Sequence, residues 1–202
     1  MTQLLLLVVV LAGGLPGQTR AQEPANGVFL VARPEMNDRT FRRTVILITQ
    51  PSQSGPVGVI INRPTAVTLA EAMPALKQLA AQSQKLHFGG PVQRRNLVFL
   101  VRTEQPPPRA VPILRDVYMT TDADWVEASL NSTAQLSAGA VRVYAGYTGW
   151  ARGQLDYEME REGWYILPAD SEYIFDRAPD DIWGELVKRA VLPKARYDLY
   201  KN

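Results

Sequence analysis

Short apolar runs separated by polar turns dominate this chain, and they predict strands more often than helices. The first three runs cover residues 28–34, 44–49 and 57–61. Continuous apolar runs of this length, bounded by turn residues, are typical of strands that are buried on both faces. Only a turn rich in Pro and Ser separates the second and third runs, so we expect these two strands to pair antiparallel. Further strands are predicted over residues 86–92, 96–102, 116–119, 141–147 and 164–169.

Helical spacing of apolar residues appears in the polar stretches between these runs. It predicts helices over residues 68–82, 122–132, 149–162 and 180–190. Thr68 and Glu71 have the spacing of a capping box, Pro74 should kink or split the first helix, and Pro179 suits the first position of the last one. Thr121 or Asp122 could cap the second helix. Because strands outnumber helices without regular alternation, the pattern indicates an α+β fold rather than a doubly wound sheet.

The amino terminus has the pattern of a secretory signal peptide. An apolar run over residues 4–12 is followed by helix-breaking glycines and proline and then by small residues at Thr19 and Ala21, which predicts cleavage after Ala21. The run is shorter than the roughly 20 residues that span a bilayer. We therefore expect a leader over residues 1–21, one domain over residues 22–202, and a periplasmic or secreted protein. The alternatives are a retained interfacial anchor, or a mis-assigned start codon on a cytoplasmic protein.

Composition narrows the chemistry that this chain can perform. The net charge of +2 falls to +1 without the leader, whose charged side chain is Arg20, and so near-neutral a charge argues against nucleic acid as a partner. The absence of cysteine excludes thiol catalysis. Since His87 is the one histidine, the sequence predicts neither a transition-metal site nor a cofactor.

The polar and glycine-rich motifs each have a functional and a structural interpretation. Gly146, Gly149 and Gly153 lie between a predicted strand and a helix, where backbone amides can bind phosphate, but their spacing matches no nucleotide motif. Asn62 and Arg63 could bind a ligand, or could hold the local backbone and pair with an acid. His87 lacks a nucleophile motif that would make it catalytic, which favours a structural role. The acids between residues 156 and 162 fit a solvated helix face with ion pairs better than catalytic carboxylates.

Several motifs together resemble the bacterial YqgE/AlgH family. They are FLVARPEMNDRTFRRTVILI, GPVGVIINRP, FGGPVQ, AGYTGWARGQLDYEM and WYILPAD, in this order along the chain. The resemblance implies a compact single-domain α+β fold with a bent, partly barrel-like mixed sheet flanked by helices. It also implies a family without an established biochemical activity, some of whose members are described as transcriptional regulators. Most members are cytoplasmic and lack a leader, whereas the amino-terminal pattern of this chain predicts one.

The leading hypothesis is an exported, non-enzymatic binding or accessory protein that holds an unknown small ligand or protein partner. We expect its site where the family motifs converge, at Asn62, Arg63, Gly89, Gly90, Gly149, Trp150 and Gln154. A cytoplasmic regulator or nucleotide binder is the second hypothesis. The third is a hydrolase, which would need a carboxylate or Tyr147 beside Arg63 in a cleft.

Overall fold

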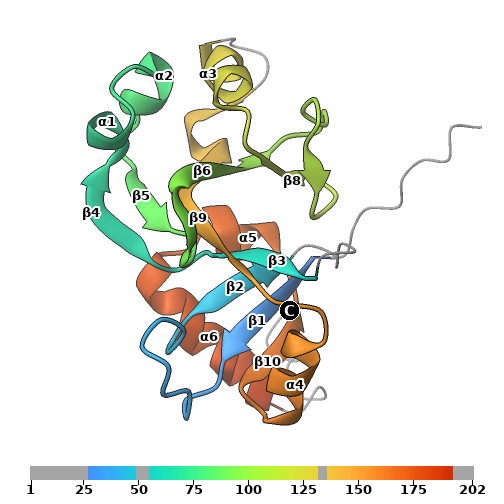
Figure 1. The fold of residues 1–202 in the computed structure, drawn as a ribbon. Coiled ribbons are helices and arrows are strands. Elements are labelled where there is room, and N and C mark those ends of the chain that lie inside the picture. Colours follow the sequence, from blue (N-terminus) through green and yellow to red (C-terminus); the bar gives the residue numbers. More distant parts are fainter. Residues whose placement is uncertain (1–26, 49–54, 132–135, 193–202) are drawn as a thin grey trace, which may run out of the picture.

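The computed structural model describes residues 27–48, 55–131 and 136–192, and Figure 1 shows how their helices and strands are arranged. The strands are β1 Val28–Ala32, β2 Val45–Ile48, β3 Val57–Ile60, β4 Pro64–Thr68, β5 Lys85–Phe88, β6 Val92–Arg102, β7 Val111–Pro112, β8 Val117–Thr120, β9 Val141–Gly149 and β10 Trp164–Pro168. The helices are α1 Leu69–Ala72, α2 Lys77–Ala80, α3 Ala123–Asn131, α4 Gln154–Glu160, α5 Ser171–Phe175 and α6 Pro179–Val191, with a 3-10 turn at Ala138–Ala140. The predicted leader lies outside the described residues.

One mixed sheet organises the fold and confirms the predicted α+β class. Its main path runs β10-β1-β2-β3-β9-β6-β8-β7, and these neighbours pair antiparallel. The exception is the parallel pairing of β5 with β9, and β5 also holds β4 as its antiparallel partner. The sheet curls into a half-barrel, in which β9 pairs with β3 at its carboxyl end and with β6 along most of its length (Figure 1).

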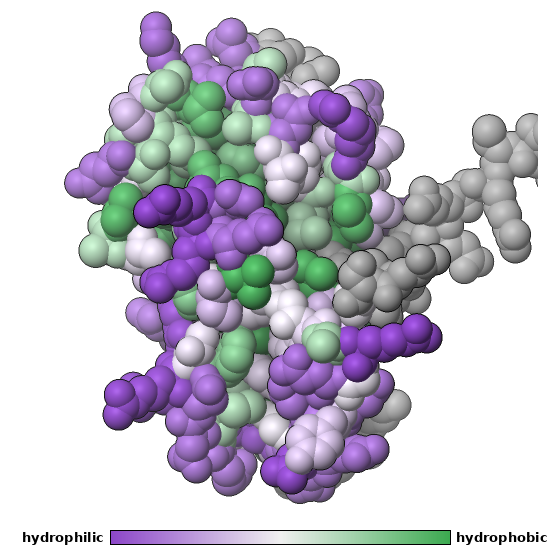
Figure 2. All heavy atoms as spheres, in the orientation of Figure 1, coloured by the Kyte–Doolittle hydropathy of each residue, from purple (hydrophilic) through white to green (hydrophobic). Residues whose placement is uncertain are grey.

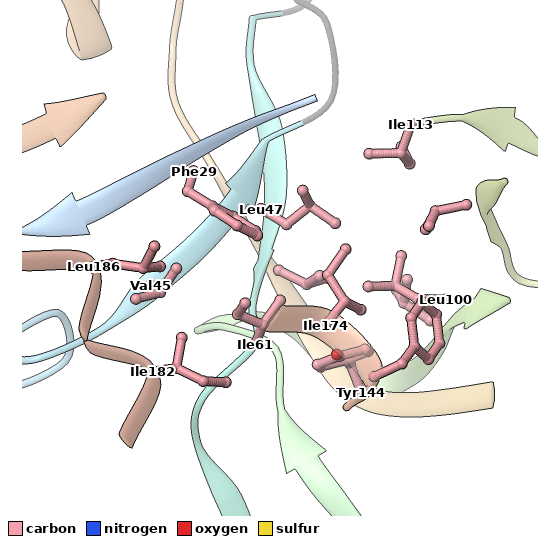
Figure 3. Close-up of a cluster of buried hydrophobic side chains, with 14 of the residues drawn as sticks. Phe29, Val45, Leu47, Ile61, Leu100, Ile113, Tyr144, Ile174, Ile182 and Leu186 are labelled. Carbon is pink, nitrogen blue, oxygen red and sulfur yellow. The ribbon is translucent and has the colours of Figure 1, made fainter. Parts of the chain in front are cut away.

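The first strands are buried on both faces, as their continuous apolar runs predict. Alternate residues of β1, β2 and β3 face two different cores. One core, drawn in Figure 3, packs against α5 and α6 and includes Phe29, Val31, Val45, Leu47 and Val59. The other packs against Trp150, Trp164 and α4, and includes Leu30, Ala32, Ile46, Ile48 and Ile60. The predicted antiparallel hairpin of β2 and β3 is confirmed.

A third core lies under α1, α2 and α3, where Leu69, Leu79 and Val126 meet the far side of β6 and β9. Large apolar side chains that remain exposed are scattered over different elements, and Figure 2 shows that polar side chains break the apolar surface into small patches on this face. Within the described residues, no helix combines the length and the apolar character needed to cross a bilayer.

The helix predictions are confirmed in part. The capping box of Thr68 and Glu71 is present, and the region around Pro74 separates α1 from α2. Asp122, one of the two candidate caps, accepts a hydrogen bond from the Trp125 amide at 3.0 Å. The helix predicted over residues 149–162 is wrong at its start, because β9 continues to Gly149 and α4 begins only at Gln154, after a turn with Gly153 in the left-handed region.

Candidate functional site

Asn62 and Arg63 hold the backbone around β2. The Asn62 Oδ1 accepts a hydrogen bond from the Val45 amide at 2.8 Å, and its Nδ2 donates to the Arg43 carbonyl at 3.0 Å. The Arg63 guanidinium donates to the carbonyls of Thr40 and Arg42. These contacts support the structural interpretation, although Arg63 binds carbonyls instead of the acid that the sequence suggested.

Gly89 and Gly90 let the turn after β5 lie against β9. A Cβ at Gly89 would stand 2.2 Å from the carbonyl oxygen of Gly146, and one at Gly90 would stand 2.2 Å from the backbone carbon of Tyr147. Gly90 and Gly146 also have positive φ angles, of 155° and 71°. The turn after β5 and the backbone of β9 therefore lie closer together than a residue with a Cβ atom would allow.

Gly149, Trp150 and Gln154 belong to a different region, next to α4. Trp150 is buried, and its indole N–H donates to Glu158 at 3.0 Å. The Trp164 indole donates to the same carboxylate oxygen at 3.1 Å, while Gln154 Nε2 donates to the other oxygen at 3.0 Å. Glu158 is thus the centre of a hydrogen-bond network, not part of the solvated helix face that the sequence predicted.

The seven predicted site residues therefore fall into two groups. Asn62, Arg63, Gly89 and Gly90 lie together, since the Phe88 amide donates to the Arg63 carbonyl and the Ile60 amide donates to the Gly89 carbonyl. Gly149, Trp150 and Gln154 lie on the α4 side of the sheet. The loop over residues 38–43 contacts both groups, because it receives Arg63 and also places Phe41 against Trp150 with ring centroids 6.5 Å apart. Ligand binding at these seven residues stays a prediction.

A cleft of about 300 Å³ opens beside the first group, between the β4–β5 pair and the corner where α5 meets α6. Its walls are formed by residues from five segments of the chain, namely Ile61, Pro64, Gln84, Lys85, His87, Arg142, Ile174, Arg177, Pro179 and Ile182. Asn62 and Arg63 sit between two of these lining residues, and Gly89 follows His87 by two positions. The predicted motif residues thus position the wall of the cleft.

His87 is a buried side chain in this wall. Its Nδ1 lies 3.1 Å from the Lys85 carbonyl oxygen, and because a carbonyl can only accept, Nδ1 carries the hydrogen in this arrangement. Burial lowers the pKa of His87 to about 4, and the nearby Arg142 guanidinium acts in the same direction. The imidazole is therefore neutral at physiological pH, with Nε2 able to accept a proton.

Arg142 lies next to His87 and is held by neutral acceptors. Its guanidinium donates to the Gln84 Oε1 at 3.3 Å and to backbone carbonyls at Gly139, Val141 and Phe175. Burial lowers its pKa below the ordinary value for arginine. Sequence reasoning missed Arg142, although a cation inside the apolar run of β9 was an available signal.

The hydroxyl of Tyr144 completes this polar cluster. Tyr144 is fully buried, its ring lies 5.5 Å from that of His87, and its hydroxyl has no hydrogen-bond partner in the structure. Burial raises the pKa of this phenol above its ordinary value, so the hydroxyl keeps its proton. In Figure 3 Tyr144 lies in the same cluster as Ile61, Ile174 and Ile182, the apolar side of the cleft.

The cleft provides binding groups but no recognisable catalytic set. Among its described lining residues, none carries a hydroxyl, a thiol or a carboxylate. Tyr147, which the hydrolase hypothesis named beside Arg63 as the alternative to a carboxylate, lines another hollow together with Val57 and Met119. No group of three or more metal-ligating side chains lies together among the residues that the structure describes.

Comparison with known proteins places the chain in a family. The family model described as AlgH-like matches residues 29–194, so the chain belongs to the AlgH-like family. A UPF0301 protein of Mycobacterium bovis (strain BCG / Pasteur 1173P2) is 35% identical over 177 residues, which cover 86% of each chain. The resemblance inferred from the motifs is confirmed.

Solved structures agree with the fold. The crystal structure of protein DIP2367 from Corynebacterium diphtheriae has a TM-score of 0.69 at 27% identity, covering 85% of this chain and 90% of that one. The solution structure of the AlgH protein from Pseudomonas aeruginosa, also named UPF0301, has a TM-score of 0.68 at 28% identity, covering 88% of this chain and 95% of that one. None of these names states a biochemical activity.

Proposed function

We propose that this chain is a non-enzymatic binding or accessory protein of the cell envelope that holds a small ligand in the cleft between β5 and the α5–α6 corner. The observation that carries this proposal is the composition of the cleft wall. Isoleucines and prolines form one part of it, and a few polar groups converge on the other. Small-molecule sites are typically concave, largely apolar and supplied with few polar groups, and a volume of about 300 Å³ lies at the small end of their range.

The export half of the proposal rests on the amino-terminal pattern of residues 1–21. Cell fractionation followed by sequencing of the mature amino terminus tests it. We expect a periplasmic or secreted protein that begins at Gln22. An intact Met1 in the cytoplasm would refute export and favour the cytoplasmic alternative, while leaving the cleft as a ligand site.

The binding half is tested by thermal-shift screening of a metabolite library that contains neutral, cationic and anionic compounds. Lys85→Trp is the informative variant, because Lys85 is exposed at the cleft and a large ring there should block entry without disturbing the core. Lys77→Trp is the matched control, since Lys77 is an exposed residue of α2 that is not among the lining residues.

We expect compounds that stabilise the wild type and Lys77→Trp but not Lys85→Trp. A library that stabilises none of the three proteins, or that stabilises all of them equally, would contradict a ligand site in the cleft.

A further inference from the structure

The charged side chains that line the cleft among the described residues are of one sign. Lys85, Arg142 and Arg177 line it together with His87, and no Asp or Glu is found among its described lining residues. Since the chain as a whole is close to neutral, with 22 basic and 20 acidic side chains, this local excess of cations is a property of the cleft and not of the composition.

The three cations differ in how far acids compensate them. Arg177 forms ion pairs with Glu172 at 2.8 Å and with Glu185 at 3.9 Å, so its charge is largely balanced. Lys85 is exposed at the mouth of the cleft. Arg142 is the exception, because it is half-buried and its described hydrogen bonds all go to neutral acceptors.

Asp176 is the acid that acts on Arg142 from a distance, but its carboxylate is already bound by another arginine. Both of its oxygens accept from Arg102, at 2.6 Å and 3.0 Å. A bidentate pair of this kind uses the best acceptor directions of the carboxylate. Arg142 therefore carries a charge that is partly removed from water and lacks a carboxylate of its own, an arrangement that a bound anion would stabilise.

The apolar residues of the lining indicate which chemical group the rest of the ligand should carry. Ile61, Ile174 and Ile182 are apolar and nearly buried, and they would contact whatever part of a ligand lies away from the cations. These side chains are only 2–4% exposed, so a short apolar body would gain mainly from van der Waals contact with them, which inorganic phosphate or sulfate makes to a smaller extent. A volume of about 300 Å³ restricts that body to a small group.

From these contacts we infer that the cleft binds a small organic anion, with its carboxylate, sulfonate or phosphate oxygens toward Lys85 and Arg142 and its short apolar body on Ile61, Ile174 and Ile182. This inference rests on the proposed binding function and names the chemical class of the ligand. The hydroxyl of Tyr144, which is buried beside Arg142 and lacks an acceptor, would be a further donor if the side chains shift when the anion enters.

Isothermal titration calorimetry with four probes of equal chain length tests this inference on the mature protein. Hexanoate and hexanesulfonate carry an anionic head, hexanamide is neutral and hexylamine is cationic. We expect both anions to bind, hexanamide to bind at least about tenfold more weakly, which corresponds to about 1.4 kcal/mol, and hexylamine not to bind. Inorganic phosphate should bind more weakly than hexanesulfonate, because it makes fewer van der Waals contacts with the isoleucines of the lining.

Charge reversal at the cleft mouth supplies the matched pair of variants. Lys85→Glu should weaken hexanesulfonate binding about fivefold, an effect limited by solvent screening of an exposed charge. Lys77→Glu makes the same change outside the cleft and should leave the affinity unchanged. Both lysines are exposed, so both variants should keep the melting temperature of the wild type.

The results separate this inference from the function on which it rests. Equal affinity for hexanamide and hexanoate, or an unchanged affinity in Lys85→Glu, would overturn the anionic ligand class. If library compounds still bound in the cleft and were blocked by Lys85→Trp, the binding function would stand without it. Failure of all four probes and of the whole library would overturn both.

Discussion

Glu158 is a carboxylate whose surroundings the sequence predicted wrongly. Its spacing among other acids predicted a solvated face of the helix. In the structure it accepts hydrogen bonds from the indoles of Trp150 and Trp164 and from Gln154, which fixes α4 on the core that contains both tryptophans. Sequence spacing could not show this, because Trp164 lies beyond the helix and reaches Glu158 only through the fold.

Glu158→Ala should lower the free energy of unfolding by about 2 to 4 kcal/mol, because two part-buried indole donors lose a charged acceptor. Chemical denaturation followed by tryptophan fluorescence measures the change. Glu160→Ala, an exposed position of the same helix, should change the stability by no more than about 0.5 kcal/mol. Equal, small effects of both substitutions would contradict the network.

Arg63 is the predicted site residue whose two interpretations separate most clearly. Because its guanidinium donates to the carbonyls of Thr40 and Arg42, Arg63→Ala should lower the free energy of unfolding by about 1 to 3 kcal/mol. Arg39→Ala, in the same loop but exposed, is the control. If Arg63→Ala had the melting temperature of the wild type but bound a ligand more weakly, the hypothesis that Arg63 binds the ligand directly would be favoured instead.

His87 should make stability depend on pH in a definite direction. Its pKa in the folded protein is about 4, below the ordinary value of 6.5, so the unfolded chain takes up the proton first as the pH falls. Stability is therefore lost between pH 6.5 and pH 4, on the order of 3 kcal/mol in total. His87→Asn removes this contribution, and urea unfolding across that range should show a shallower loss for the variant. If the wild type and His87→Asn lost stability equally as the pH fell, the low pKa of the buried His87 would be contradicted.

At the scale of elements, the sequence predicted most of the strands but did not predict short elements such as β4 and α5. Continuous apolar runs identified β1, β2 and β3 because both faces of these strands are buried. The five-residue β4 was not predicted, because it is mostly exposed and lacks an apolar pattern. The five-residue α5 is too short to show helical periodicity, although Asp170 caps it.

Gly90 marks the point where the turn after β5 touches β9, and this contact positions His87. Gly90→Ala should destabilise the protein by about 3 kcal/mol or more, because the new Cβ would meet the backbone of Tyr147 at 2.2 Å and the residue has a positive φ. Gly149→Ala is the control, since its Cβ would lie 3.5 Å from the nearest atom, in the Tyr147 ring. Thermal unfolding of the two variants measures the contrast. Similar melting temperatures would show that the strands can separate at little cost.

At the scale of the whole molecule, the cleft could not be predicted from the sequence. Its lining residues come from segments around positions 61, 85, 142, 174 and 180, which only the curled sheet and the helical corner bring together. The sequence motifs did lead to its border, because Asn62, Arg63 and the Gly89-Gly90 turn hold the strands that form one wall. The sequence did not single out Arg142 and Arg177, and only the fold places them in the lining of the same cleft as His87.

The predicted leader also concerns the whole molecule, because export would decide in which compartment the protein meets its ligand. Because the chain has no cysteine, it depends on apolar burial and not on disulfides for its stability in any compartment, and the three cores supply that burial.

The central claim, a cationic cleft built for an organic anion, is tested most directly by an NMR titration of the His87 imidazole, the one histidine of the chain, with and without saturating hexanesulfonate. Hexanesulfonate stays ionised throughout the titration, so its charge does not change. The account predicts a pKa of about 4 for the free protein and a higher pKa in the complex, because a nearby anion favours the protonated ring. An ordinary pKa in the free protein, or a pKa that hexanesulfonate leaves unchanged, would contradict it.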